Sequence, residues 1–266
     1  MPAINRSASE QTLVDASGPE FLEALARGLR VIETFNQDRK QLTLSDIAKL
    51  VDLPRASVRR TLHTLVQLGY AEMDERMFRL KPRVLNLARA YLQSNAVTDI
   101  MQPALERLSE QTGESCSTAV LDGADVTMIA HASPKRVLPV SAQIGFRLPA
   151  SATALGRVLL AALDDRELER FLARLRPEQI TKFTVTDKAQ LRKAILDVRK
   201  SGFALADQEV EIGFRSIAIP LKKRDGRVIA ALNIGVHSER TSLKAMHGHY
   251  FAGLQTIADE LQQQLI

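Results

Sequence analysis

The sequence predicts an α/β multidomain chain: an N-terminal winged helix-turn-helix, a linker helix and a C-terminal α+β domain. Within residues 42–80, two short amphipathic helices meet at a tight turn and an alternating hairpin follows them directly, which predicts the first part. The second part is predicted by the change, after residue 113, to strands that alternate with helices. A length of 266 residues also favours two domains over one.

Short signals set the ends of the elements in the first part. Thr43 and Asp46 have the spacing of a capping box, in which a hydroxyl and a carboxylate bind free amides at a helix start. Pro54 suits the first turn of the second helix, where a missing N–H has no cost. Gly69 is placed to end that helix. Residues 70–80 alternate around a polar turn, which predicts a two-stranded hairpin.

The second helix has one apolar and one basic face. Val58, Leu62 and Leu65 recur at helical spacing and predict the buried stripe. The opposite face carries arginines and small polar residues, and no Asp or Glu occurs between residues 54 and 69. An ordinary solvated helix face, which is the alternative interpretation, normally mixes both signs of charge. The pattern therefore favours a helix that enters the major groove of DNA.

Predicted contacts with double-stranded DNA follow from this placement. Polar side chains of the second helix would read base edges, while the wing and the start of the first helix would hold phosphates. One such helix reads only a few base pairs, so at least a dimer is expected on the DNA. The predicted DNA-binding residues are Thr43, Ser45, Arg55, Ser57, Arg59, Arg60, His63, Arg76 and Arg79.

The chain is expected to divide into four regions. Residues 1–19 are small and polar without an apolar period, which predicts a flexible N-terminal arm. Residues 20–81 form the winged helix-turn-helix domain. A linker helix follows over 82–96, and its wide apolar face favours packing, including on a second copy of the chain. Residues 97–266 form the second domain.

The second domain is predicted to be α+β because its strands are flanked by helices. The dipeptides Asp122-Gly123 and Asp225-Gly226 mark two tight turns between strands. Strands are predicted over 116–121, 126–130, 136–142, 203–210, 216–222 and 228–237. Helices are predicted over 97–112, 153–163, 165–175, 187–200 and 242–266.

Composition limits the class of protein. Hydrophobic residues make up 45% of the chain and charged residues 25%, which is a globular composition. The formal net charge of +5 permits nucleic-acid binding without demanding it. The single cysteine, Cys116, excludes an intrachain disulfide and fits a reducing cytoplasm. No run approaches the ~18 apolar residues of a membrane span, so we expect a cytoplasmic protein without a membrane partner.

An enzyme is the less favoured alternative. Cys116 and His131 are a candidate nucleophile and base, but they fall on predicted strands without a third orienting group. His247 and His249 lie two residues apart on a predicted helix, so they point apart and do not easily share a metal. Three carboxylates alternate along one predicted strand and indicate a solvated face or one pocket contact rather than acid/base catalysis: Asp207, Glu209 and Glu211. We predict no catalytic residue, no metal site and no cofactor.

Four segments carry a family resemblance. They are LPRASVRRTLHTLVQLGY (53–70), SAQIGFRLPASATALGRVLLAAL (141–163), GFALADQEVEIGFRSIAIPL (202–221) and GRVIAALNIGVHSER (226–240). From about residue 21 to its end, the chain resembles the IclR family of bacterial transcriptional regulators. The motifs RLPA…GRVLLA and DQE…G-RSIA-P, in the second and third of these segments, are similar to the branch that controls β-ketoadipate-pathway and other aromatic-acid catabolism genes.

The resemblance implies a fold and a mechanism. The C-terminal part would be a GAF-like effector-binding domain that takes a small carboxylic acid, and the chain would act as a homodimer or homotetramer on palindromic operators. Repression and activation, the latter with RNA polymerase as a partner, both stay open. So does the choice of effector among 4-hydroxybenzoate, protocatechuate, β-ketoadipate and muconate. The alternative is a ligand-independent DNA-binding repressor.

An effector site is predicted at the start of the helix over 153–163. Thr153 is placed as its N-cap, and the amides after it would face a carboxylate. The resemblance adds positions that line the pocket in relatives: Val137, Val140, Leu148, Ala154, Leu155, Ala206, Phe214, Ser216, Asn233 and Gly235.

This chain departs from acetate-metabolism relatives at three of those positions. Ala206 stands where some of them have an acidic residue, and Asp207, its neighbour, is added to the predicted site. Asn233 and Gly235 replace paired serines. The resemblance therefore implies an acid with a ring or hydrocarbon body rather than glyoxylate or pyruvate.

Overall fold

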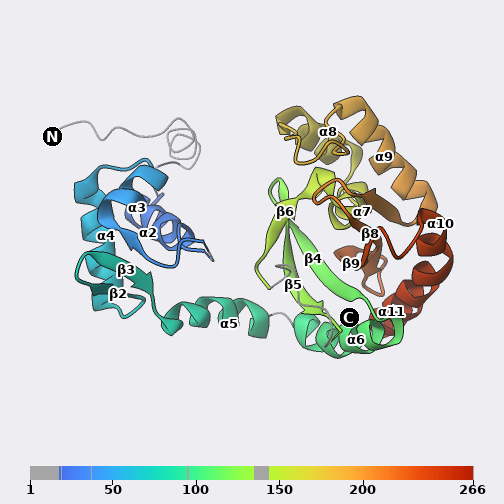
Figure 1. The fold of residues 1–266 in the computed structure, drawn as a ribbon, viewed down its shortest axis with the longest axis horizontal. Coiled ribbons are helices and arrows are strands. Elements are labelled where there is room, and N and C mark those ends of the chain that lie inside the picture. The colour runs from blue at the N-terminus through green and yellow to red at the C-terminus, as the bar shows by residue number, and fades with distance from the viewer. Residues whose placement is uncertain (1–17, 19, 37, 95, 135–143, 266) are drawn as a thin grey trace. The chain divides into compact units, whose positions relative to one another are not determined.

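A computed structural model describes residues 18, 20–36, 38–94, 96–134 and 144–265 of the chain (Figure 1). The chain divides into two compact units between Tyr91 and Leu92. The predicted arm over 1–19 and the predicted strand over 136–142 lie outside the described residues, except for Gly18. No helix in the described ranges is long and apolar enough to cross a membrane.

Unit 1 is a small helical domain with a three-stranded antiparallel sheet of order β1-β3-β2. Its sheet contains one more strand than predicted, because two residues before the first helix pair with the wing. The elements are α2 (Glu23–Glu33), β1 (Leu42–Thr43), α3 (Leu44–Leu50), α4 (Arg55–Gln67), β2 (Ala71–Asp74) and β3 (Met77–Leu80). A 3-10 turn (Pro82–Val84) and α5 (Leu85–Ser94) follow.

The end signals of α3 and α4 act as predicted. Thr43 Oγ1 accepts a hydrogen bond from the Asp46 amide at 3.2 Å, and the Asp46 carboxylate accepts one from the Thr43 amide at 3.1 Å. These bonds confirm the capping box. The pKa of Asp46 is lowered because its carboxylate accepts hydrogen bonds from the Thr43 hydroxyl and from the Thr43 amide. Gly69 follows the end of α4 with a φ of 75°, a left-handed conformation that favours glycine. The stripe of α4 predicted to be buried is buried.

Unit 2 is a six-stranded antiparallel sheet of order β6-β5-β4-β9-β8-β7 between two helical layers (Figure 1). The strands are β4 (Ser115–Asp122), β5 (Asp125–Ala132), β6 (Arg147–Pro149), β7 (Ala204–Asp207), β8 (Phe214–Lys222) and β9 (Val228–His237). One layer holds α6 (Ala96–Thr112), α10 (Leu243–Ala245), a π-helical turn (Met246–Tyr250) and α11 (Phe251–Gln264). The other holds a 3-10 turn (Ala150–Ala152), α7 (Ala154–Ala161), α8 (Asp165–Arg174) and α9 (Lys188–Ser201).

The two faces of this sheet carry side chains of different size. Toward α6 and α11, the central strands present bulky residues such as Ile217, Leu232 and Ile234. Toward α7, the same strands present small residues: Ser115, Ser117, Ala119, Ala204, Ala206, Ser216, Ala218, Ala231 and Gly235. Because neighbouring residues of a strand point to opposite faces, this alternation fills one side and leaves space on the other.

Three predictions about this unit need correction. The strand expected over 203–210 ends at Asp207, because Gln208 adopts a φ of 61° and turns the chain. The carboxylates at 207, 209 and 211 therefore do not share a strand face, and that prediction was wrong. The helix expected over 242–266 is interrupted by the π-helical turn. The three-residue strand β6 was not predicted, since so short a segment has no readable alternation.

A substitution at Gly156 tests how closely α7 packs against the 3-10 turn that precedes it. A Cβ at this position would lie 2.0 Å from the Ala150 carbonyl oxygen, a backbone atom that cannot move aside. We expect Gly156→Ala to lower the free energy of unfolding by about 1–3 kcal/mol through overpacking, as measured by urea denaturation. Gly248→Ala is the matched control, because nothing lies within 4 Å of its added methyl group. Equal effects of the two substitutions would contradict this packing.

Candidate nucleic-acid interface and buried cavity

The exposed face of α4 borders a groove that also involves the wing. Arg55, Arg59 and His63 lie one turn apart along α4, and all three side chains are exposed. The groove has a volume of about 560 Å³. Six of the nine predicted DNA-binding residues line it: Thr43, Ser45, Arg55, Arg59, His63 and Arg76. A basic helix face is thus joined to the wing and to the start of α3 in one concave surface.

The other three predicted DNA-binding residues lie elsewhere. Ser57 and Arg60 line a second groove, of about 540 Å³, between α4 and α2. Arg79 lies on β3 and forms an ion pair with Glu72 of β2. Both partners of that pair are partly exposed, so the attraction is weak and Arg79 can exchange partners at low cost.

A cavity lies in unit 2 between α7 and the small-residue face of the sheet. Its volume is about 220 Å³. Eight of the twelve predicted effector residues line it: Leu148, Thr153, Leu155, Ala206, Phe214, Ser216, Asn233 and Gly235. Ala154 is buried in the core of the α7 layer, and Asp207 pairs with Arg215 at 2.5 Å, so neither lines the cavity. Val137 and Val140 lie outside the described residues.

Gly235 makes space for an aromatic wall. A Cβ on Gly235 would lie 2.5 Å from the ring of Phe214, which stands on the neighbouring strand and also lines the cavity. The lack of a side chain at position 235 therefore allows the ring to lie over β9. This contact gives the cavity a flat apolar surface beside its polar residues.

The start of α7 forms one wall of the cavity. Thr153 caps the helix: its Oγ1 accepts a hydrogen bond from the Gly156 amide at 3.0 Å and donates to the Pro149 carbonyl at 3.3 Å. The Gly156 amide is therefore already satisfied, contrary to the prediction that it would face a ligand. The first intrahelical bond runs from the Arg157 amide to the Thr153 carbonyl. The amides of Ala154 and Leu155 precede it and have no partner within the helix.

Sequence reasoning missed the polar residues that β4 and β5 contribute. Ser117 pairs in register with Asn233 on one side and with His131 on the other, and all three line the cavity. Ser117 Oγ lies 2.9 Å from His131 Nδ1. Burial lowers the pKa of His131, so the ring is neutral near pH 7. Every second residue of β9 points to the cavity, and the residues of β4 and β5 that pair with them point the same way. These residues could be found from the sequence only if the order of the strands in the sheet were known.

The candidate pair of Cys116 and His131 is not assembled. Cys116 pairs with Ala132 and points into the core beneath α6 and α11, whereas His131 points to the opposite face. Burial raises the pKa of the Cys116 thiol to about 12, so it stays protonated and is a poor nucleophile. Within the described part of the chain, no group of three His, Cys, Asp or Glu residues is placed to hold a metal ion.

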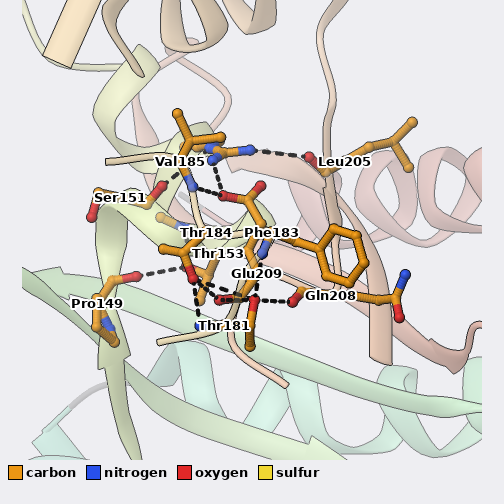
Figure 2. Close-up of polar contacts among 12 residues, drawn as sticks. Pro149, Ser151, Thr153, Thr181, Phe183, Thr184, Val185, Leu205, Gln208 and Glu209 are labelled. Carbon is orange, nitrogen blue, oxygen red and sulfur yellow. Dashed lines mark hydrogen bonds and ion pairs between the residues drawn. The ribbon is translucent and has the colours of Figure 1, made fainter. Parts of the chain in front are cut away.

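A buried ion pair closes the cavity beside α7 (Figure 2). Arg157 Nη2 donates to Glu209 Oε2 at 2.6 Å, and both side chains are less than one tenth exposed. The same carboxylate oxygen accepts a bond from the Val185 amide at 3.1 Å. Thr184 Oγ1 donates to the Glu209 carbonyl at 2.6 Å. The network ties the turn after β7 to α7 and to the segment before α9.

The electrostatic character of the cavity is unusual for an anion site. Glu114, Glu209 and Glu211 are among the lining residues, and no Lys or Arg is found in the lining among the described residues. Burial raises the pKa of Glu114. An anion therefore has no Lys or Arg side chain to bind on these walls. The donors available to it are backbone amides, the side chains of Ser115, Ser117, Ser216 and Asn233, and the rings of His131 and His237.

The chain is similar to known proteins over nearly its whole length. The family model "Bacterial transcriptional regulator IclR C-terminal" matches residues 89–263, and the IclR helix-turn-helix domain matches residues 24–75. The Pca regulon regulatory protein of Pseudomonas putida is 39% identical over 99% of this chain and 91% of its own length. The p-hydroxybenzoate hydroxylase transcriptional activator of Acinetobacter baylyi is 33% identical over 91% of this chain and 92% of its own length.

Solved structures share the fold. A Rhodococcus sp. RHA1 protein described as a transcriptional regulator has 43% identity and a TM-score of 0.80, covering 92% of this chain and 98% of its own. An IclR homolog from Microbacterium hydrocarbonoxydans, solved in complex with 4-hydroxybenzoate, has 28% identity and a TM-score of 0.75. That match covers 91% of this chain and 98% of the other.

The buried ion pair gives a stability prediction. Arg157→Met leaves the Glu209 carboxylate buried without its cation, so we expect a loss of about 3–5 kcal/mol in the free energy of unfolding. The double variant Arg157→Met, Glu209→Leu removes both charges and should recover part of that loss. Arg192→Met, which breaks a solvent-screened surface pair with Glu169, is the control and should cost far less stability. If Arg157→Met costs no more than this control in urea denaturation, the pair has no structural role.

Proposed function

We propose that this chain, which belongs to the IclR family of bacterial transcriptional regulators, controls aromatic-acid catabolism genes through operator binding that a small aromatic acid gates. The observation that carries the proposal is that one chain holds two separate sites. A basic helix face without carboxylates borders the wing of unit 1, and a small cavity lies in unit 2. The names of the relatives above support the gene class and the effector class.

In unit 1, α4 would enter the major groove and the wing would follow the backbone. Arg59 and His63 would read base edges, since they lie at the centre of the exposed face of α4. Arg55, Arg76 and the start of α3 would hold phosphates from the two sides of the same groove. Ser57 and Arg60 would contact the DNA strand that lies on the α2 side of α4. Arg79 would bind a phosphate after its ion pair with Glu72 breaks.

In unit 2, the effector carboxylate would lie at the start of α7. The amides of Ala154 and Leu155 have no partner within the helix, and a carboxylate there also interacts favourably with the helix dipole. Ser216 and Asn233 line the facing wall and offer neutral hydrogen bonds. Leu148 and Phe214 supply apolar surface for a ring. The 4-hydroxybenzoate complex of the Microbacterium homolog supports an aromatic acid of this size.

Two copies of the chain would be needed to read a palindromic operator. Several leucines of unit 1 are exposed on α2 and α5, among them Leu25 at 61% and Leu85 at 68%, and such a patch favours association. A second copy of unit 1 is the proposed occupant, in a dimer or a tetramer. Because α5 spans the boundary at Tyr91, effector binding would change the spacing of the two DNA-binding heads through it. The coupling would be about 1–3 kcal/mol.

Substitutions on α4 test DNA reading. We expect the double variant Arg59→Ala, Arg60→Ala to bind operator DNA at least tenfold more weakly, because each base contact contributes about 1–3 kcal/mol. Fluorescence anisotropy of labelled DNA from upstream of the protein's own gene, at fixed salt, measures this. The control is Arg227→Ala, which removes one positive charge from an exposed turn of unit 2. It should change the operator affinity less than twofold. Unchanged affinity in the double variant would place the DNA-reading surface elsewhere.

Substitutions in the cavity test effector binding. Ser216→Ala should weaken 4-hydroxybenzoate binding by about two- to tenfold, the effect of losing one neutral hydrogen bond. Thr153→Val removes the N-cap that orders the start of α7 and should weaken binding by a similar factor. Isothermal titration calorimetry on the full chain measures the affinity. Thr256→Val is the control, since Thr256 is an exposed residue of α11. Identical affinities in all four proteins would mean that the acid binds outside this cavity.

A further inference from the structure

Helix α6 is bonded to two residues that line the cavity, although it packs on the opposite face of the sheet. Gln102 Nε2 donates to the His131 carbonyl of β5 at 3.0 Å, and Ser109 Oγ donates to the Glu114 carbonyl, just before β4, at 2.8 Å. Both acceptor residues line the cavity. We call Gln102 and Ser109 the two anchors of α6.

The two anchors lie on one face of α6. Gln102 and Ser109 are seven residues apart in the sequence, which is about two turns of an α-helix, so their side chains point the same way. Ser109 is buried and holds the second half of the helix against the start of β4. Gln102 holds the first half against the end of β5. The position of α6 on the sheet therefore depends on the carbonyls of two cavity-lining residues.

Pro103 makes the Gln102 anchor decisive for the direction in which α6 begins. Proline lacks a backbone N–H, so the turn that contains Gln102 has one helical hydrogen bond fewer, and proline is a usual cause of helix bending. The part of α6 before Pro103 therefore depends on contacts outside the helix, and the bond from Gln102 to His131 is one of them. This part follows the linker closely, since α5 ends at Ser94 and α6 begins at Ala96.

His131 joins the cavity to the Gln102 anchor. Its Nδ1 lies 2.9 Å from Ser117 Oγ, so the ring is held in the wall that β4 and β5 form, while its carbonyl accepts the bond from Gln102. A ligand that fills the cavity packs against this wall. No hydrogen bond to the ring nitrogens is needed, because a close-packed interior transmits a displacement by contact alone. A shift of β5 at His131 thus reaches α6 through one hydrogen bond.

We propose that Gln102 is the residue through which a ligand in the cavity changes the direction of the start of α6, and with it the operator affinity of unit 1. This inference rests on the proposed function, which supplies the effector and the gating of operator binding. Gln102 is a positioning residue, since it does not line the cavity and acts through the His131 carbonyl. Ser109 keeps the second half of α6 in place while the first half moves.

Gln102→Met tests the inference, because methionine has a similar length and a high helix propensity but no donor for the His131 carbonyl. Fluorescence anisotropy gives the operator affinity of the full chain with and without saturating 4-hydroxybenzoate, and we call the ratio of the two affinities the coupling ratio. We expect this ratio to fall from about 5- to 150-fold in the native chain to below about threefold in the variant. Operator affinity without the acid, and acid affinity by calorimetry, should stay within about threefold of native, because Gln102 binds neither ligand.

Gln262→Met is the matched control. Gln262 of α11 belongs to the same helical layer, is partly buried, and donates through Nε2 to the Lys223 carbonyl at the same distance of 3.0 Å. Lys223 lies in the turn between β8 and β9 and is not a cavity-lining residue. Because each variant loses one amide-to-carbonyl bond, the two should lose similar stability in urea denaturation. Only Gln102→Met should lose the coupling ratio.

The outcomes distinguish this inference from the proposed function. If Gln102→Met keeps the native coupling ratio, or if both variants lose it equally, Gln102 has only a structural role, so the inference fails while the proposed function stands. If 4-hydroxybenzoate leaves the operator affinity of the native chain unchanged, the proposed function fails and the inference fails with it. Loss of the coupling ratio in Gln102→Met alone supports both.

Discussion

The difference in side-chain size between the two faces of the central sheet determines most of what unit 2 can do. Bulky residues such as Ile217 and Ile234 fill the face under α6 and α11, which fixes that layer by apolar burial. Alanine, serine and glycine on the other face allow α7 to approach and leave a cavity of about 220 Å³. Gly156 and the Arg157–Glu209 pair then hold α7 over that space. The cavity therefore results from the alternation in β4, β8 and β9, and the turn after β7 completes its wall with Glu209, Val210 and Glu211.

Local signals predicted the fold well where the deciding contacts are local. The capping box at Thr43 and the left-handed Gly69 lie within the elements they bound, so sequence spacing was sufficient. Non-local features were not predictable in this way. The strand β1 exists only because it pairs with β3, more than 30 residues later, and Glu209 is buried because Arg157 reaches it from α7.

The residues of the candidate sites likewise divide into those that local patterns predict and those that depend on non-local contacts. Positions that the family resemblance supplied gave seven of the cavity residues, including Ser216 and Asn233, and the helix-start signal gave Thr153. Ser117 and His131 were missed, because their place in the cavity depends on the order of β5, β4 and β9, which no pattern within one strand reveals. On α4, the arginines predicted to share one surface separate between two grooves, since helical spacing fixes a face but not its neighbours.

The two units carry complementary chemistry: a basic surface suited to a polyanion, and a small cavity suited to a single ring. The central claim is that a ligand in the cavity changes the affinity of unit 1 for DNA. The most direct measurement is the operator affinity of the full chain, by fluorescence anisotropy at fixed salt, with and without saturating 4-hydroxybenzoate. A shift of about 5- to 150-fold, the range of typical allosteric coupling, is expected. Calorimetric binding of the acid without any change in operator affinity or stoichiometry would contradict the account.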